Sequence, residues 1–338
     1  MKTTPITRLA SLVLIALVAV NFFGGCEKKD ASGKLQKITL RQAWFPWCGY
    51  AGEVAATGAI ASSYGVDLTV EKGADDIDPI KLVLAGNNDF GVASAETVVD
   101  ACLKGADLVI IGVINYKTPT CFIALEEQGV HSFQDFKGKK VGILTATETE
   151  TAYKLLKLKG IIDASSVTEI EVPFDIASFV TTKSYDIRPA YVYDEPISLD
   201  AKGVKYTMLK ADAHVSLISG VYFTRGKTLR ESPDKVRAFV FAMADGWTSA
   251  LAHPEEAIRL LSAYDKGVDA KKELQSLKVG LDYFSGENGR VLWASPERLK
   301  GFAEALVSLK KTANTSDILK WIDLRFVDEY AAKKGAKK

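Results

Sequence analysis

The stretch KKVGILTATETETAYKLLKLKG, residues 139–160, decides the fold because it starts a second run of strands and helices. KKVGIL has the pattern of a buried strand, and TETAYKLLKLKG has the pattern of a helix. A further strand, TEIEVPF, follows, and then a short helix around IASFVTT and the strand that carries YVY. This alternation predicts a second small α/β unit over residues 129–219.

The residues on either side of this unit predict the rest of the fold. Before it, KITLRQAW, VDLTVEKG, NDFGVAS, LVIIGVIN and PTCFIALEE read as strands, most of them separated by helical patterns, which is typical of a mainly parallel sheet. After it, SGVYFTRG returns as a strand, and Ser232 and Pro233 begin a mostly helical segment. We therefore expect an α/β fold of two lobes, residues 37–128 with 220–338 and residues 129–219, joined by two crossovers.

The N-terminus has the pattern of a targeting segment. Lys2 and Arg8 precede the apolar run LASLVLIALVAV, which is short for a membrane span, and FFGGC ends at Cys26. Small residues before a cysteine resemble a bacterial lipobox, so we expect a signal peptide over residues 1–25, a diacylated Cys26 and a polar tether over residues 26–36. An ordinary signal cut elsewhere or an uncleaved anchor are the alternatives. An acylated chain would be exported and held on the outer face of the cytoplasmic membrane or in the periplasm.

Charge and cysteine content narrow the class of protein. The chain has 43 Lys and Arg against 42 Asp and Glu, and removal of the signal peptide takes away two basic residues and no acidic one. This balance argues against nucleic acid as a partner. Beyond Cys26 the cysteines are Cys48, Cys102 and Cys121, an odd number without metal-ligand spacing. We expect them to be buried as small apolar residues, and one pair among them is left open.

Ligands of open α/β sheets bind beyond the carboxyl ends of the strands, so the strand ends carry the candidate site. The first strand end, QAWFPWCGYAG, places Trp44, Trp47 and Tyr50 close together around Pro46. Such an excess of aromatic area in a strand-to-helix loop predicts stacking on a flat ligand. The alternative is a packed loop whose rings serve the core.

Two more strand ends lead into helices. GVASAETVV puts Ser94 before a helix, and LTATETETAY puts Thr145 and Thr147 before another. Hydroxyl groups and free backbone N–H groups at a helix start suit a polar or anionic ligand group. The alternative is that these side chains only cap the helices.

The fourth strand end is YVYDEP, residues 191–196. Read as an extended strand, it places Tyr191, Tyr193 and Glu195 on one face, two aromatic rings beside a carboxylate. We expect the rings to stack on a flat ligand and the carboxylate to accept from its donor edge. The alternative is one tyrosine in the core and Glu195 as a helix cap before Pro196.

The motifs WFPWCGYAGEVAA, DFGVASAE, FKGKKVGI, SYDIRPAYVYDEP and SPDKVRAFVFAMADGWTSALAHPEEA, with a helix opening at Asp78-Pro79, carry a family resemblance over residues 38–263. The chain resembles the solute-binding proteins of ABC importers that take up thiamine-pyrimidine precursors, with riboflavin, nitrate and sulfonate binders as relatives. The resemblance implies a two-lobed, periplasmic-binding-protein-like fold of type II, with the ligand cleft between the lobes. It also implies that Tyr191 and Tyr193 pack on a heterocycle, while Glu195 hydrogen-bonds a ring nitrogen and an exocyclic amine.

One departure from the family pattern bears on the ligand. Where the precursor binders have polar Asn and Thr and then His, this chain has Trp47, Cys48 and Tyr50. The more aromatic lip favours a larger or more apolar flat ligand, such as a flavin. We therefore expect a monomeric, lipid-anchored binding protein that delivers a thiamine pyrimidine precursor or a riboflavin-like vitamin to an ABC permease and ATPase, without cofactor or metal. A binder of sulfonate or nitrate is the alternative.

Two further classes compete with a binding protein. Eukaryotic relatives of this fold make the thiamine pyrimidine, with a histidine and a cysteine-rich iron motif. Here His131, His214 and His253 all lie away from the four strand ends, and no cysteine cluster or Gly-rich phosphate loop is present, so we expect no catalytic residue. The third class is a lipoprotein with a structural or signalling role.

Overall fold

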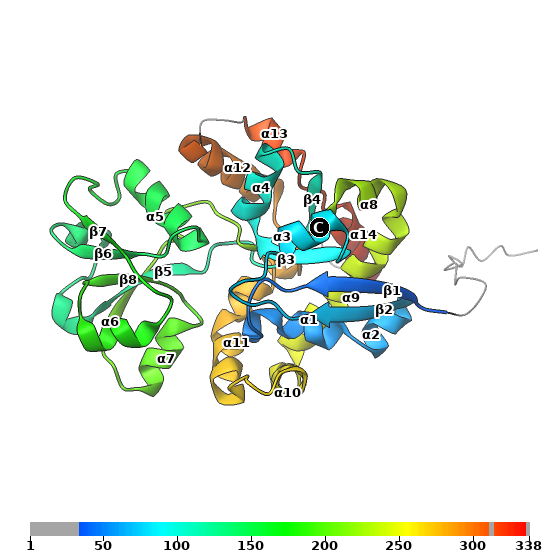
Figure 1. Ribbon diagram of the computed structural model, residues 1–338, viewed down its shortest axis with the longest axis horizontal. Helices are drawn as coiled ribbons and strands as arrows, with labels where there is room; N and C mark the ends of the chain where they lie inside the picture. The colour runs from blue at the N-terminus through cyan, green and yellow to red at the C-terminus, as the bar shows by residue number, and fades with distance from the viewer. Residues whose placement is uncertain (1–33, 311–313, 336–338) are drawn as a thin grey trace, which may run out of the picture. The chain divides into compact units, whose positions relative to one another are not determined.

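Two five-stranded sheets organise the chain in the computed structural model, which describes residues 34–310 and 314–335 (Figure 1). The strands of the first sheet, in spatial order, are β2 (Val66–Glu71), β1 (Gln36–Arg41), β3 (Phe90–Ser94), β10 (Gly220–Arg225) and β4 (Leu108–Val113). Those of the second are β7 (Thr168–Glu171), β6 (Lys140–Ile143), β8 (Ile187–Tyr191), β5 (Thr120–Leu125) and β9 (Tyr206–Lys210). We call the first sheet with its helices lobe one and the second with its helices lobe two.

The two sheets are built on the same plan. In lobe one β1 pairs in parallel with β2 and β3, and β10 runs antiparallel to β3 and β4. In lobe two β6 pairs in parallel with β7 and β8, and β5 runs antiparallel to β8 and β9. In each lobe the antiparallel strand is thus the one that follows a crossover, β10 in lobe one and β5 in lobe two. The other four strands of each sheet run in parallel, as the strand–helix alternation predicted.

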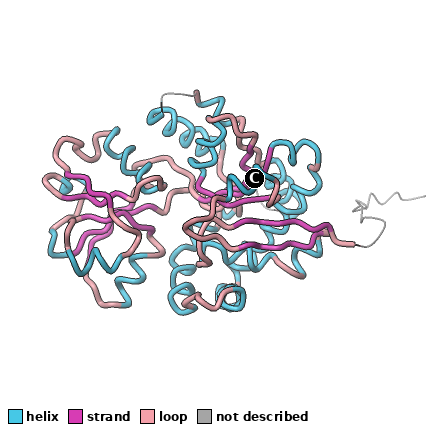
Figure 2. The backbone as a smooth tube through the Cα atoms, viewed as in Figure 1, coloured by secondary structure: helices cyan, strands magenta, loops and turns pink. Residues whose placement is uncertain are grey.

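Helices cover these sheets, as the backbone trace shows (Figure 2). The helices of lobe one that precede the first crossover are α1 (Ala51–Ala56), α2 (Ala59–Ser63), α3 (Pro79–Ala85) and α4 (Ala95–Leu103). Those that follow the second crossover are α8 (Gly226–Glu231), α9 (Pro233–Ala252), α10 (Pro254–Tyr264), α11 (Ala270–Phe284), α12 (Pro296–Lys310), α13 (Thr315–Leu319) and α14 (Arg325–Lys334). The helices of lobe two are α5 (Glu148–Leu158), α6 (Ile176–Thr182) and α7 (Glu195–Ala201). Short 3-10 turns are η1 (Cys48–Tyr50), η2 (Glu126–Gln128), η3 (Phe133–Phe136) and η4 (Glu287–Gly289).

The predicted two-lobed α/β fold with two crossovers is confirmed, but the expected position of the first crossover is wrong. Strand β5 belongs to the second sheet, where Cys121 pairs with Ala190 on β8 and with Lys210 on β9. The chain therefore passes from lobe one to lobe two before Thr120, whereas residues up to 128 were expected in lobe one. An apolar strand pattern shows that a strand is buried but not which sheet it joins.

The two crossover segments, residues 114–119 and 211–219, hold each other by backbone hydrogen bonds. Ile114 N donates to Gly220 O at 2.8 Å, and Ser219 N donates to Asn115 O at 2.9 Å. Ala95 N, at the start of α4, donates to Ser219 O at 3.1 Å. The second crossover is therefore tied both to the first crossover and to lobe one, just where the lobes join.

Helices α1, α9 and α11 of lobe one pack closely around a tryptophan. Helices α1 and α9 approach each other at Gly52 and Gly246, and a Cβ at Gly52 would lie 2.3 Å from the Trp247 ring. Trp247 is fully buried, stacks on Phe284 with centroids 4.9 Å apart, and donates to the Tyr222 hydroxyl at 2.8 Å. This packing fixes the end of α11, whose last turn reaches lobe two.

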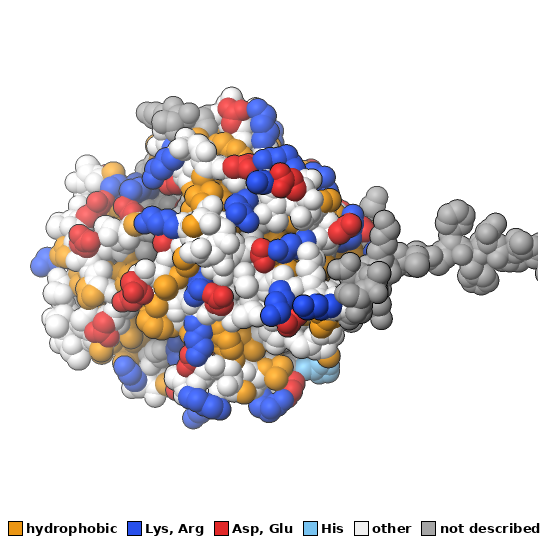
Figure 3. Space-filling model, turned by 45° about the vertical axis from the view of Figure 1, so that its right-hand side comes forward, with side chains coloured by type: hydrophobic (Ala, Val, Ile, Leu, Met, Phe, Trp, Pro, Cys, Tyr) orange, Lys and Arg blue, Asp and Glu red, His pale blue; other side chains and the backbone are white. Residues whose placement is uncertain are grey.

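The structure also bears on what the sequence predicted about the cysteines, the N-terminal segment and the surface charge. Cys48, Cys102 and Cys121 are buried, as predicted, and all three are unpaired, which the sequence had left open. The predicted signal peptide, Cys26 and most of the tether lie outside the described residues. Within residues 34–310 and 314–335 no helix is long and apolar enough to cross a membrane. Basic and acidic side chains are interspersed on the face drawn in Figure 3.

Candidate ligand-binding site

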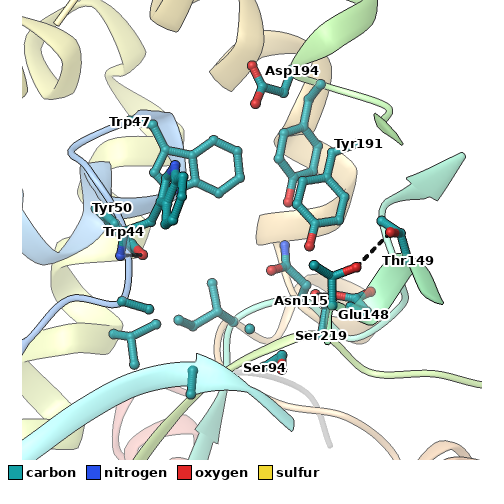
Figure 4. Close-up of a pocket in the computed structure, with 18 of the residues that line it drawn as sticks. Trp44, Trp47, Tyr50, Ser94, Asn115, Glu148, Thr149, Tyr191, Asp194 and Ser219 are labelled. Carbon is teal, nitrogen blue, oxygen red and sulfur yellow. Dashed lines mark hydrogen bonds between the residues drawn. The ribbon is translucent and has the colours of Figure 1, made fainter. Parts of the chain in front are cut away.

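A cavity of about 370 Å³ opens where strand-end loops of both lobes meet the crossover segments (Figure 4). Eight of the nine residues predicted to contact a ligand line it: Trp44, Trp47, Tyr50, Ser94, Thr147, Tyr191, Tyr193 and Glu195. Thr145 does not, because its exposed hydroxyl donates instead to Glu171 Oε1 at 2.9 Å. Other polar and aromatic lining residues, absent from the prediction, are Asn115, Glu148, Thr149, Phe174, Asp194, Ser219 and Phe284.

Three aromatic rings form facing walls of this cavity. Trp47 comes from the loop between β1 and α1. Its ring centroid lies 6.3 Å from that of Tyr191, and the two ring planes make an angle of 25°. It lies 5.6 Å from the Tyr193 ring at 32°. Figure 4 shows Trp44 and Trp47 on one side and Tyr191 on the other. The near-parallel rings come from different lobes, so a flat molecule between them would touch both.

The loop that carries Trp47 is shaped for its indole ring. A Cβ at Gly49 would lie 2.6 Å from two atoms of the Trp47 ring, so only glycine lets the ring lie this close to the backbone. Tyr50 is buried and its hydroxyl accepts from Trp44 N at 2.9 Å. The Cys48 N–H donates to Glu273 on α11 at 2.7 Å. Both ends of the aromatic loop are thereby fixed to lobe one.

The YVYDEP segment reaches the cavity by a turn and not as the extended strand that was predicted. Strand β8 ends at Tyr191, Asp194 N donates back to Tyr191 O at 3.0 Å, and α7 begins at Glu195. Pro196 in the first turn of α7 favours a helix start at this point. The turn still brings the Tyr191 and Tyr193 rings together, with centroids 6.3 Å apart at 25°, and both line the cavity.

Glu195 has a partner that the sequence did not predict. Its Oε2 accepts from the backbone N–H of Tyr191 at 2.9 Å, which fixes the carboxyl group beside the ring that it was expected to accompany. Burial, followed by the nearby charge of Asp194, raises the pKa of Glu195 to about 7. This partner lies at the end of β8 and not in the first turn of α7, so the bond is not the helix cap that was the alternative. The residue lines the cavity, and its contact with a ligand stays a prediction.

Glu148 is the main polar feature that sequence reasoning missed. It is the first residue of α5, it is 2% exposed, and its two carboxylate oxygens accept from the Thr118 and Ser219 hydroxyls, one from each crossover. Burial, and then repulsion from Glu96, raises its pKa to about 8. The sequence showed it only as one acidic residue among threonines in TATETET, where a solvated first-turn glutamate is the ordinary reading.

The helix starts expected to attract an anion carry buried acids instead. At α4 the first residue's N–H is taken by Ser219 O, the Ser94 hydroxyl bonds Thr97, and Glu96 occupies the first turn. At α5 Thr147 accepts from Glu150 N at 3.4 Å as a helix cap. The acidic side chains in the first turns of α4 and α5 already interact with the positive ends of the helix dipoles. Little of this positive potential is therefore available to an anionic ligand.

No basic side chain lines the cavity among the described residues. A basic residue beside its acidic wall, Lys272 on α11, pairs with Asp194 and with Glu273 at 3.2 Å. Lys272 belongs to lobe one and Asp194 to lobe two, so the ion pair crosses between the lobes. Within the described ranges no group of acidic, histidine or cysteine side chains has the geometry to hold a metal ion.

Comparison with known proteins agrees with the fold. The chain is 26% identical over 204 residues to a 4-amino-5-hydroxymethyl-2-methylpyrimidine phosphate synthase from Legionella pneumophila subsp. pneumophila, covering 59% of this chain and 64% of that protein. It is 24% identical over 237 residues to the riboflavin-binding protein RibY from Chloroflexus aurantiacus, covering 68% and 67%. The match to the synthase thus spans less than two thirds of that relative's own length.

Among solved structures, the periplasmic aliphatic sulphonate binding protein SsuA from Escherichia coli superposes with a TM-score of 0.65. The two chains are 15% identical, and the match covers 86% of this chain and 91% of that one. At this identity the likeness shows the two-lobed fold. The family model described as NMT1/THI5 like matches residues 62–257, which is more than half of the chain. The predicted family resemblance is therefore confirmed, and this chain belongs to the NMT1/THI5-like family.

Proposed function

We propose that this protein is an exported, lipid-anchored solute-binding protein that holds a small flat heterocycle between its lobes and delivers it to an ABC importer. One observation carries the proposal: the Trp47 and Tyr191 rings face each other across the cavity at 6.3 Å and 25°. A ring sandwiched between them needs about 7 Å, two contacts of roughly 3.5 Å each. Because the centroid distance of 6.3 Å is smaller than this, the lobes must separate further to admit the ring.

The polar groups of the cavity support a ligand with hydrogen-bond donors. Glu148 and Glu195 are acceptors when ionised, and the Asn115 side chain and the Ser219 hydroxyl also face the cavity. A thiamine pyrimidine precursor or a riboflavin-like vitamin offers a flat ring system with N–H donors at its edge. The riboflavin-binding relative, named above, agrees with this ligand class.

A sulfonate or nitrate ligand is the alternative that the fold likeness to SsuA favours. An anion in this cavity would lie beside the carboxyl groups of Glu148 and Glu195 and would find no lysine or arginine in the described lining. Desolvating an anion without a cationic or well-placed donor partner is costly. The heterocycle is therefore the better-supported ligand.

An enzyme of pyrimidine synthesis is the alternative of another class, and the name of the Legionella relative favours it. Among the residues that the structure describes, the lining includes no histidine and no cysteine, the side chains expected for such chemistry. Native mass spectrometry of the purified protein separates the two. A binding protein carries its ligand and returns it chemically unchanged after long incubation, whereas an enzyme yields a product of altered mass.

Calorimetric titration of the wild type and of Glu195→Gln tests the ligand class. The probes are riboflavin, a thiamine pyrimidine precursor, taurine and nitrate. For an amine-bearing ring, Glu195→Gln leaves a donor facing a donor and weakens binding by about tenfold or more. For an anion, loss of the carboxylate strengthens binding. Unchanged affinity for every probe would show that the Glu195 side chain makes no contact with the ligand.

A further inference from the structure

Most of the acidic side chains on the cavity wall have no ion-pair partner in the part of the chain that the structure describes. Three acidic residues line it, Glu148, Asp194 and Glu195, and Asp194 alone is matched by a lysine, Lys272. The partners of Glu148 are two neutral hydroxyls, and the partner of Glu195 is a neutral backbone N–H. The buried carboxyl group of Glu148 and the half-buried one of Glu195 therefore face the cavity without an ion pair among the described residues.

Among the described residues, the charged groups behind this wall form no ion pair with Glu148 or Glu195. Glu96, on α4, is 5% exposed, repels Glu148, and neither of its carboxylate oxygens has a hydrogen-bond partner among the described residues. Arg188, on β8, is fully buried, and its charge acts on Glu195 to lower the pKa of that carboxyl group against the larger effect of burial. Its guanidinium donates to Pro173 O at 2.9 Å, to Phe174 O and to the Tyr185 hydroxyl at 3.0 Å, so its hydrogen bonds go to groups other than Glu195.

The aromatic walls suit the same kind of ligand as the carboxyl groups. A cation is attracted to the face of an aromatic ring within about 6 Å of its centroid. The Trp47 and Tyr191 centroids are 6.3 Å apart, so a group midway between them is well inside that range of both. Burial excludes water, which strengthens the attraction between a cation and the two carboxylates.

We infer that the cavity selects a flat heterocycle that carries a positive charge, with Glu148 and Glu195 as its counter-charges and Trp47 and Tyr191 on its faces. This inference rests on the proposed function and specifies its ligand class further. With a neutral ring bound, the two carboxyl groups would remain protonated for part of the time. A cationic ring would instead balance the charge of the two carboxylates, and their protons would be released.

Proton exchange on binding is the direct consequence. In the empty cavity, burial raises the pKa of Glu148 to about 8 and that of Glu195 to about 7, so both hold protons for part of the time near neutrality. Burial likewise raises the pKa of Glu96 to about 7, while the high pKa of Tyr191 keeps its hydroxyl neutral. A bound cation lowers the pKa of the two lining acids, so binding at pH 7 releases protons and strengthens as pH rises from 6 to 8.5.

The test is calorimetric titration at pH 7 in two buffers that differ in ionisation enthalpy, such as phosphate and Tris. The probes are thiamine and 1-methylquinolinium, which carry fixed positive charge, and riboflavin and quinoline, which are neutral. We expect the methylquinolinium to bind about tenfold or more tightly than quinoline, a difference of roughly 1.4 kcal/mol, and to release protons. In Glu148→Gln this advantage and the proton release both shrink.

Glu127→Gln is the matched control, because Glu127 is an exposed glutamate of lobe two that pairs with Lys183 outside the cavity. It should bind each probe as the wild type does, and melting curves show whether Glu148→Gln is folded. Binding of neutral heterocycles as tightly as cations, or with proton uptake, would overturn the inference and leave the proposed function standing. Failure of every heterocycle to bind the wild type would overturn both.

Discussion

Trp44 of lobe one and Phe174 of lobe two touch across the mouth of the cavity, with ring centroids 5.4 Å apart. Phe174 is 60% exposed although it is a large apolar side chain, and its carbonyl is held by the buried guanidinium of Arg188. The loop that presents Phe174 is thus anchored in the core of lobe two while the ring is kept at the surface. We expect this contact to act as a gate between the ligand and solvent.

Removal of the gate should shorten the time for which a ligand stays bound. Phe174→Ala loses an aromatic contact of about 0.5–1.5 kcal/mol, so ligand should dissociate roughly 2- to 10-fold faster, with little change in melting temperature. Stopped-flow fluorescence measures the rate. Phe45→Ala is the control, because Phe45 is 50% exposed and also contacts Trp44 but does not line the cavity. Equal dissociation rates in Phe174→Ala and the wild type would show that the contact is incidental.

The ion pair between Lys272 and Asp194 should favour the closed arrangement of the lobes. Both side chains are about one-third exposed, so the pair is worth at most about 1 kcal/mol, and Lys272→Met should weaken ligand binding by up to roughly fivefold. Small-angle X-ray scattering should show a larger radius of gyration for the ligand-free variant. Lys278→Met, which breaks an ion pair with Glu255 at the surface of the same helix, should change neither quantity. Identical scattering from both variants would contradict the expectation.

The stability of the ligand-free protein should fall as pH rises. Burial raises the pKa of Glu53 and Glu148 to about 8 and that of Glu96 and Glu195 to about 7, against about 4.3 for an unfolded glutamate. Between those values the folded state holds protons that the unfolded state has lost, so the free energy of unfolding decreases from about pH 5 to 8. Urea denaturation measures it. Glu148→Gln should flatten this slope, and a slope as steep as that of the wild type would place the cause elsewhere.

The lipid anchor is a prediction from sequence alone, since Cys26 lies outside the described residues. Cys26→Ser should release the protein from the membrane fraction and shift its electrophoretic mobility, because the acyl chains supply the membrane affinity. Fractionation followed by mass spectrometry of the N-terminal peptide checks this. Membrane association that persists unchanged in the variant, without a shift in mobility, would rule out acylation at this residue.

How far the sequence could predict the site depends on the kind of signal each residue gives. Trp47 and Tyr191 could be predicted because aromatic residues at strand ends are unusual and strand ends of α/β sheets meet at one edge. Glu148 could not, because its burial depends on hydroxyls of Thr118 and Ser219 in two crossovers that are distant in sequence. The placement of β5 in the second sheet escaped prediction for a related reason, since pairing partners are chosen in three dimensions and leave no mark in strand periodicity.

The central claim, a flat ring held between Trp47 and Tyr191, is tested most directly by comparing Tyr191→Phe with Tyr191→Ala. The titration uses whichever heterocycle the wild type binds. Phenylalanine keeps the stacking face, so Tyr191→Phe should bind nearly as the wild type does. Tyr191→Ala should lose roughly 1–3 kcal/mol of stacking, a weakening of about fivefold to more than a hundredfold. Equal affinities of the two variants for that heterocycle would contradict the account, because they would show that no ring is stacked on Tyr191.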